Sequence, residues 1–245
     1  MVKSTIDVMK TAKSKIPLRE CMKCGLLPRY PFSILISGRS GCGKTNLLMN
    51  LMKKKEYYGG WFHGILVFSP TAGEFDDTYN TLKLPKENFI KDFTPDILQK
   101  IIDRRKALIK QYGIKHVAEN FRICLILDDV IADRNFLESP EALKMFALCR
   151  HYLISSIMLI QSYNKCPRAC RLSCNGVFVF PALQSEKKVL IDELTPSNMT
   201  KKEFGKVFDH CTEGQYDFLY INNHAPPNER IRKNLETINL EDFKG

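Results

Sequence analysis

The sequence predicts an α/β fold in which a mostly parallel central sheet carries helices on both faces. Short apolar runs recur along the chain, and segments with a helical spacing of apolar residues separate most of them. Strands that are apolar throughout must be covered on both sides, and sheets of this kind are mostly parallel. Ligands of parallel sheets bind beyond the carboxyl ends of the strands, so we expect the functional residues at those ends.

The composition is that of one globular domain. The chain has 245 residues, of which 44% are hydrophobic, and this suffices to bury a full core. Its net charge of +10 favours a polyanionic partner such as nucleic acid, although solubility alone would explain a basic surface equally well. We divide the chain into a basic N-terminal extension at 1–30, a domain at 31–223 and a polar, extended C-terminal tail at 224–245.

Cysteine usage and hydropathy indicate a cytosolic protein. The nine cysteines are an odd number without framework spacing, which argues against a secreted disulfide scaffold and indicates reduced thiols. No apolar run approaches the roughly 18 residues of a membrane span. The N-terminus lacks the apolar segment of a signal peptide, so we expect neither export nor a transmembrane segment.

Each element follows from a local pattern. The apolar runs predict strands at 32–38, 64–70, 121–129, 155–162, 175–181 and 215–222. Helical spacing predicts helices at 44–54, 95–112, 139–151, 184–194 and 200–211. Ser139 with Pro140 marks the start of one helix, and Thr200 with Glu203 forms a capping box at the start of another.

A phosphate-binding loop joins the first expected strand to the first expected helix. The loop consists of Gly38, Arg39, Ser40, Gly41, Cys42, Gly43, Lys44 and Thr45, which match G-x-x-x-x-G-K-[ST] without a gap. The glycines let the backbone turn tightly and aim its N–H groups at phosphate oxygens, and the helix adds its positive end. The pattern predicts that Lys44 reaches the β- and γ-phosphates of ATP and that Thr45 ligates Mg2+.

Polar side chains end two further strands. Asp128 follows a buried strand and is predicted to hold Mg2+ together with Thr45, while Asp129 orients or deprotonates the attacking water. Two helix-capping acids after a core strand would look the same, and the phosphate loop is what favours the metal site. Gln161 ends the fourth strand. If that strand lies between the strands of the loop and of the acids, its amide faces the γ-phosphate; otherwise it is an ordinary polar strand end.

In this order and spacing, GRSGCGKTNLLMNLM, LILDDV, CRHYLISSIMLIQS and RLSCNGVFVF resemble the genome-packaging ATPases of large DNA viruses, the poxvirus-type packaging family related to the FtsK/HerA DNA pumps. The resemblance covers about residues 30–182. It implies a P-loop NTPase fold of the additional-strand type and a homo-oligomeric ring that drives double-stranded DNA into a capsid with ATP. It also implies a capsid, portal or membrane protein of the virion as partner, and a location in the host cytoplasm (the viral factory), the virion or both.

The resemblance bears on individual residues as well. It maps Lys44, Thr45, Asp128, Asp129 and Gln161 onto the family's site, with Asp129 where many relatives carry the longer Glu. Ring ATPases of this kind supply an arginine across the subunit interface, where it stabilises charge in the transition state. Arg150 and Arg171 are the candidates, with Arg168 nearby; simple surface arginines are the alternative interpretation.

Two weaker patterns have ordinary explanations. Cys21 and Cys24 resemble half of a zinc knuckle, but zinc needs four ligands and the chain has no second C-x-x-C, so two unrelated thiols are favoured. Paired and tripled lysines either line a DNA channel or form solvated helix faces; they are Lys53, Lys54, Lys55, Lys187, Lys188, Lys201 and Lys202.

Two other function classes use the same loop. A nucleoside or nucleotide kinase needs an acceptor pocket and an Arg-rich lid, whereas the paired acids and Gln161 fit attack by water better. A nucleotide-dependent switch without motor activity is the second class. Guanine specificity would need Asn/Thr-Lys-x-Asp, and the nearest string, at 164–167, lacks the Asp. An ATP-driven translocase of double-stranded DNA is therefore the predicted function.

Overall fold

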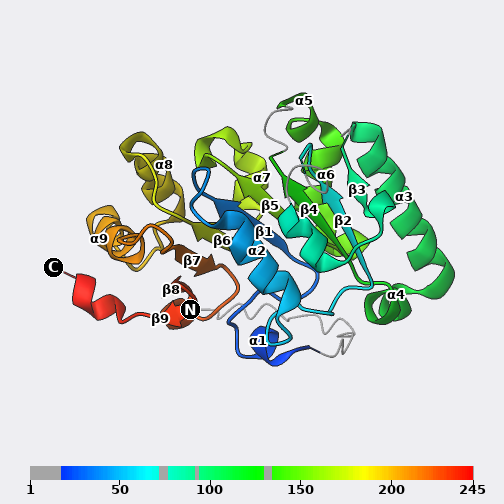
Figure 1. Ribbon diagram of the computed structural model, residues 1–245. Helices are drawn as coiled ribbons and strands as arrows, with labels where there is room; N and C mark the ends of the chain where they lie inside the picture. The colour runs from blue at the N-terminus through cyan, green and yellow to red at the C-terminus, as the bar shows by residue number, and fades with distance from the viewer. Residues whose placement is uncertain (1–17, 72–76, 92–93, 130–133, 245) are drawn as a thin grey trace, which may run out of the picture.

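The computed structural model describes residues 18–71, 77–91, 94–129 and 134–244. In this part of the chain a nine-stranded sheet forms the centre, in the order β3-β2-β4-β5-β1-β6-β7-β8-β9 (Figure 1). The strands from β3 to β6 in this order are parallel to one another. β7, β8 and β9 each pair antiparallel with the strand before them. The mostly parallel sheet predicted from the apolar runs is thus confirmed.

The parallel strands match the predicted runs closely. They are β1 (Ser33–Ser37), β2 (Gly64–Phe68), β3 (Phe89–Ile90), β4 (Ile123–Asp128), β5 (Ile154–Ile160) and β6 (Gly176–Val179). β5 pairs with both β1 and β4, so it separates the strand of the phosphate loop from the strand of the two acids. This extra strand between the two motif strands confirms the additional-strand type of P-loop fold.

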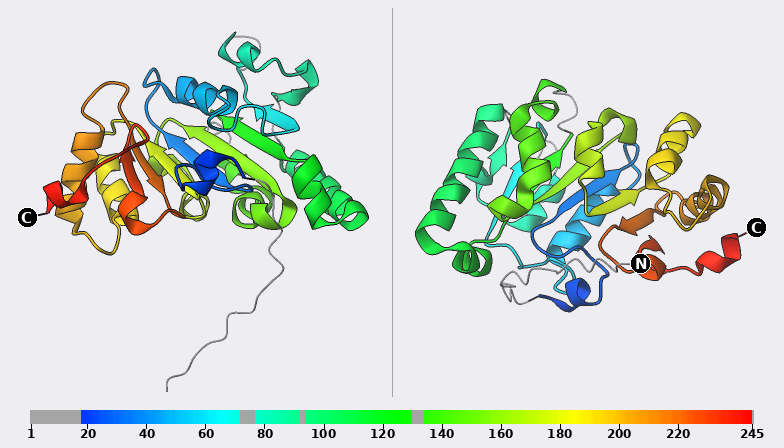
Figure 2. Two further views of the ribbon diagram at one scale, coloured as in Figure 1. Left: turned by 90° about the horizontal axis from the view of Figure 1, so that it is seen from below. Right: turned by 180° about the vertical axis from the view of Figure 1, so that it is seen from behind.

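The helices form a layer on each face of the sheet. They are α1 (Glu20–Lys23), α2 (Lys44–Lys53), α3 (Pro95–Tyr112), α4 (Ile114–Asn120), α5 (Arg134–Leu137), α6 (Pro140–Tyr152), α7 (Arg168–Leu172), α8 (Gln184–Leu194) and α9 (Lys201–Cys211). Core residues of α1, α2 and α4 pack on one face, and those of α3, α6, α8 and α9 on the other. Figure 2 shows the second layer from behind, with α6 and α7 in front of the sheet.

Helix starts follow the predicted caps. The Ser139 side chain accepts a hydrogen bond from the backbone of Ala142, and Pro140 occupies the first turn of α6. Thr200 and Glu203 form both halves of the capping box at α9. These side chains bind N–H groups that have no partner within the helix, which is why the chain turns helical at these residues.

The C-terminal region corrects the prediction of a polar, extended tail at 224–245. After β7 (Leu219–Asn222), the chain adds β8 (Ile231–Lys233) and β9 (Glu236–Thr237) to the same sheet. Ile231 is buried, and Ile238, Leu240 and Phe243 pack against the core. Strands this short give no alternating pattern for sequence analysis to detect, and their anchors are single apolar residues between charges.

The N-terminal boundary also shifts. Residues 1–17 of the predicted extension lie outside the described residues. Cys21, Met22, Leu27 and Tyr30 are buried in the core on the α2 face, so residues 18–30 belong to the domain. The Tyr30 hydroxyl donates a hydrogen bond to the Leu153 carbonyl, 2.6 Å away, which ties this segment to the turn before β5.

Candidate nucleotide-binding site

The phosphate loop connects the end of β1 to the start of α2, and its glycines meet specific backbone demands. Gly41 and Gly43 have φ of 76° and 102°, in the left-handed region that favours glycine. A side chain at Gly38 would place its Cβ 2.7 Å from Cys42 Sγ and 2.7 Å from Phe180 Cβ, too close for any atom. Glycine meets these demands without backbone strain or a steric clash.

The start of α2 presents donors to this loop. No side chain caps the helix at Gly43, so the first N–H groups of α2 remain available to an anion. The Lys44 ammonium lies over the loop and donates hydrogen bonds to the carbonyls of Gly38 and Arg39, 2.7 and 2.9 Å away. Thr45 is half-buried in the first turn. The start of α2 and the Lys44 ammonium together give the loop a positive polarity that suits phosphates.

Burial keeps the Cys42 thiol in this loop neutral. Desolvation raises the pKa of Cys42, and the nearby Lys44 ammonium opposes that effect only in part. A neutral thiol adds no negative charge to a surface that has to attract phosphates.

Asp128 ends β4 and is fixed by a residue that sequence analysis missed. The Tyr79 hydroxyl donates a hydrogen bond to Asp128 Oδ2 across 2.6 Å, and both side chains are buried. Tyr79 comes from the short 3-10 helix Asp77–Leu82. That segment lies in a polar, turn-rich stretch without a motif, so nothing in the sequence pointed to it. The bond holds one carboxylate oxygen of Asp128 in place.

Asp129 and Gln161 meet beside the phosphate loop. Gln161 Nε2 donates a hydrogen bond to Asp129 Oδ1 at 3.0 Å. Parallel pairing sets Asp128 opposite Leu159, which brings the ends of β4 and β5 level. On the other side of β5, the Gly38 amide donates to the Ile160 carbonyl at 3.0 Å. The predicted condition for Gln161, a strand between the two motif strands, is met.

The backbone at Asp129 adopts an uncommon conformation. Its φ is 53°, a left-handed value that aspartate and asparagine tolerate better than most other residues. The chain turns out of β4 immediately after Asp128, so the carboxylates of Asp128 and Asp129 lie in different environments. Asp128 is buried against Tyr79, whereas Asp129 is half-buried and bonded to Gln161.

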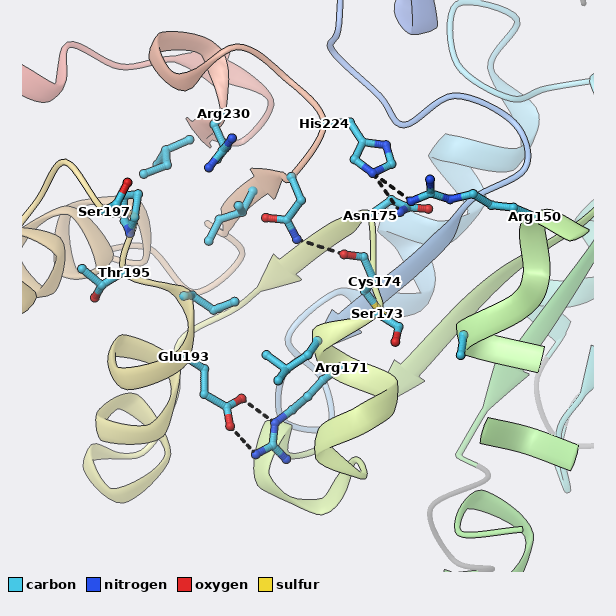
Figure 3. Close-up of a pocket in the computed structure, with 17 residues that line it drawn as sticks. Arg150, Arg171, Ser173, Cys174, Asn175, Glu193, Thr195, Ser197, His224 and Arg230 are labelled. Atoms are coloured by element: carbon cyan, nitrogen blue, oxygen red, sulfur yellow. Dashed lines mark hydrogen bonds and ion pairs between the residues drawn. The ribbon is translucent and has the colours of Figure 1, made fainter. Parts of the chain in front are cut away.

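Arg171 is tied to its own chain. Its guanidinium forms a bidentate ion pair with Glu193, with N–O distances of 2.6 and 2.8 Å (Figure 3). It also donates a third hydrogen bond, to the Cys166 carbonyl. The side chains of the pair are only 10% and 11% exposed. The hydrogen bonds from Arg171 lower the pKa of Glu193. In this position Arg171 joins α7 to α8 and does not reach outwards.

Arg150 lies near the amino ends of the parallel strands, whereas the phosphate loop lies at their carboxyl ends. It is exposed at the end of α6, with its guanidinium 3.2 Å from His224 Nε2 (Figure 3). Burial, and then the neighbouring Arg150, lower the pKa of His224, so this imidazole stays neutral beside the cation. Arg150 and Arg171 both line a cavity of about 680 Å3 between the end of α6 and the amino end of β6. Arg168, the third arginine nearby, is exposed and bonds Glu193 at 3.2 Å.

The Arg171–Glu193 pair makes a testable contribution to stability. Glu193→Gln should lower the free energy of unfolding at neutral pH by about 3 kcal/mol, because it leaves a mostly buried guanidinium without its charged partner. Arg168→Ala, the matched control, removes an exposed partner and should cost less than about 1 kcal/mol. Urea unfolding measures both.

The same pair predicts a pH dependence. Because Arg171 lowers the pKa of Glu193 in the folded state, its stabilisation is present above the unfolded pKa of about 4.3 and is lost as pH falls through the lower folded value. The difference between wild type and Glu193→Gln should therefore shrink in acid. A constant difference from pH 7 to pH 3 would show that the pair contributes no charge-dependent stability.

The described residues offer no support for a zinc site. The Cys24 thiol donates to the Cys21 carbonyl, and within the described ranges no three His, Cys, Asp or Glu side chains gather as metal ligands. The buried thiols Cys166, Cys170 and Cys174 pack in the core between α7 and the sheet. Of the helices in the described ranges, none combines the length and apolarity needed to cross a membrane.

Comparison with solved structures finds viral packaging enzymes with this fold. The DNA-packaging ATPase B204 from Sulfolobus Turreted Icosahedral Virus matches with a TM-score of 0.58 at 15% identity, over 84% of this chain and 98% of that one. The genome packaging NTPase B204 from Sulfolobus turreted icosahedral virus 2, in complex with AMP, matches with a TM-score of 0.57 at 14% identity, over 83% and 96% of the two chains. At these identities the likeness shows the fold.

Sequence comparison assigns the family. Uncharacterized protein 075L of Invertebrate iridescent virus 6 is 28% identical over 196 residues, which make up 80% of this chain and 72% of the relative. The family model described as poxvirus A32 protein matches residues 22–221, a range that includes the phosphate loop, both acids and Gln161. The chain therefore belongs to the poxvirus A32 protein family, a family of viral genome-packaging ATPases.

Proposed function

We propose that this chain is an ATP-driven translocase that packages double-stranded DNA into a viral capsid, hydrolysing ATP with Mg2+ as a homo-oligomeric ring. The observation that carries the proposal is the meeting of Asp129 and Gln161 at the strand ends beside the phosphate loop. An acid and an amide at that place suit attack by water on the γ-phosphate. A kinase would instead have to admit an acceptor hydroxyl there.

The phosphate loop binds the triphosphate. The free N–H groups of α2 and the turn glycines face the phosphate oxygens, and Lys44 exchanges its two carbonyl partners for the β- and γ-phosphates. Thr45 and Asp128 are the residues that would hold Mg2+, since hydroxyl and carboxylate oxygens are the ligands this hard cation prefers. The ion supplies neutralisation of phosphate charge when bound.

Asp129 acts on the attacking water. The amide of Gln161 holds Asp129 Oδ1, so the carboxylate is oriented before substrate arrives. Asp129 orients the water or takes its proton, and Gln161 senses whether the γ-phosphate is present. Asp is shorter than the Glu of many relatives, and the left-handed backbone at this residue changes the direction in which its carboxylate leaves the strand.

Family membership and net charge support the proposed ring and its DNA substrate. Solved relatives with this fold are described as DNA-packaging enzymes. The net charge of +10 suits non-specific contact with the phosphates of a duplex. The exposed Arg150 lies near the amino ends of the parallel strands, where a neighbouring copy in a ring can approach it. We place the protein in the host cytoplasm or the virion, with a capsid, portal or membrane protein of the virion as partner.

ATPase assays with and without double-stranded DNA test the translocase. The assembled oligomer, whose mass is measured under the same conditions, should hydrolyse ATP at least about three times faster with DNA, since contact with the track is coupled to turnover. An unchanged rate in an assembled oligomer would contradict translocation. Phosphate transfer to an added nucleoside, seen by chromatography of the products, would contradict hydrolysis itself.

Mixed rings test whether Arg150 acts in trans. Lys44→Ala and Arg150→Ala subunits, each inactive alone, should regain part of the activity when mixed. The interface between an intact loop in one copy and an intact arginine in the next then becomes functional. In the control mixture, Lys44→Ala subunits are combined with Arg168→Ala subunits in place of Arg150→Ala subunits. If Arg150→Ala subunits are fully active on their own, Arg150 has no catalytic part.

A further inference from the structure

We propose that Tyr216 stacks on the adenine ring of ATP, in an apolar cavity that lies beside the phosphate loop. The inference rests on the proposed nucleotide binding and adds to it the residue that holds the base. The cavity has a volume of about 470 Å3, and Gly43, Asn46, Asn50, Phe180, Tyr216 and Phe218 contribute to its wall. A purine base and part of its ribose fit in this space.

The position of the cavity favours a nucleobase over other apolar ligands. Its wall includes Gly43, the residue that directly precedes α2, and the next two residues are those that bind phosphates and Mg2+ in the proposed function. The Tyr216 ring lies 3.4 Å from the point where a Cβ on Gly43 would sit. A nucleotide with its phosphates on the loop therefore has its base within reach of this ring.

Tyr216 is an unusual surface residue. Its side chain is the most exposed of the large hydrophobic side chains in the described ranges, at 62%. Covering a water-exposed aromatic ring with a flat ligand is favourable, and nucleobases stack on such rings whatever their sequence. Behind it, the buried rings of Phe180 and Phe218 pack with centroids 5.3 Å apart and give the cavity a rigid floor.

The segment that carries Tyr216 is held in place by its neighbour Asp217. One carboxylate oxygen of Asp217 accepts from the Gly214 amide, at 3.2 Å, and the other from the Asn234 side chain, at 2.7 Å. Asn234 in turn accepts from the backbone of Phe218, at 2.9 Å. Because these bonds fix the backbone on either side of Tyr216, little ordering of this segment is needed when a base binds.

Equilibrium binding separates the base from the phosphates. Calorimetric titration of the full chain with a non-hydrolysable ATP analogue and, separately, with inorganic tripolyphosphate, both with Mg2+, measures the two parts of the site. Tyr216→Ala should weaken binding of the ATP analogue about tenfold or more and leave tripolyphosphate unchanged. Tyr216→Phe, which keeps the ring, should bind the analogue within about threefold of wild type. Tyr112→Ala, an exposed tyrosine on α3, is the matched control.

The outcomes distinguish the two proposals. If wild type binds both ligands and Tyr216→Ala binds the ATP analogue as tightly as wild type, stacking on Tyr216 is overturned while nucleotide binding at the loop stands. Equal weakening of tripolyphosphate and of the analogue in Tyr216→Ala also overturns it, because the substitution has then disturbed the loop itself. If wild type binds neither ligand, the proposed function falls, and the role of Tyr216 falls with it.

Discussion

Lys44→Ala is expected to lower the rate of ATP hydrolysis on the order of 10³-fold. The ammonium of Lys44 lies over the phosphate loop, held by the carbonyls of Gly38 and Arg39. In the proposed function this places it, before ATP arrives, near the phosphoryl group on which negative charge develops. Release of inorganic phosphate at saturating ATP measures the effect.

Two controls show whether this loss is chemical. Lys53→Ala removes an exposed lysine at the far end of the same helix and should hydrolyse ATP within about twofold of wild type, since exposed substitutions away from special features have small effects. The thermal unfolding midpoint of Lys44→Ala should not fall, because the substitution removes a buried charge that has no ionic partner among the residues the structure describes. A variant that keeps even a tenth of wild-type activity would exclude Lys44 from charge stabilisation in the transition state.

Asp129→Asn is expected to lower the hydrolysis rate by about 10²–10⁴-fold and to leave ATP affinity within about twofold of wild type. Asparagine has the same shape, tolerates the left-handed φ of 53°, and still offers an oxygen to the Gln161 amide. What it lacks is the negative charge that orients the water or takes its proton in the proposed function. Single-turnover hydrolysis and equilibrium binding of ATP measure the two effects separately.

Asp129→Glu is the informative companion. It keeps the negative charge on a longer side chain and should hydrolyse ATP far faster than Asp129→Asn. If Asp129→Asn hydrolyses ATP normally, the water is activated elsewhere. If Asp129→Asn loses ATP affinity by the same factor as it loses hydrolysis rate, Asp129 supports the phosphate loop and has no part in the chemistry.

The elements with a strong local pattern were predictable from the sequence, and so was the position of the phosphate loop between a strand and a helix. The strand before the phosphate loop, α2 and the two capped helices begin and end within a few residues of the predicted bounds. Local rules suffice there, because burial periodicity and helix caps act over a few residues. The position of β5 could only be stated as a condition, since strand order depends on contacts between residues far apart in the chain.

Residues whose partners are distant were not predictable. Tyr79 reaches Asp128 across 49 positions, from a stretch without apolar periodicity. Arg171 is visible in the sequence as an arginine, whereas Glu193, the partner that holds it inside the chain, lies 22 positions away on another helix. Tyr216 looks like an ordinary residue of a strand run, and only the fold brings it next to Gly43. In each case a pairing made by tertiary structure decides the side chain's surroundings.

Both edge strands of the central sheet are very short, and this limits how two copies of the chain can associate. β3 and β9, the outermost strands of the described sheet, have two residues each. Such edge strands present few unpaired backbone groups, so a second molecule gains little by hydrogen-bonding its own strand there. We expect neighbouring molecules to meet through side chains of helices and turns. Contacts of that kind can shift or separate while the hydrogen bonds between the strands of each sheet stay intact. The proposed translocase needs this freedom, since its subunits would move relative to one another.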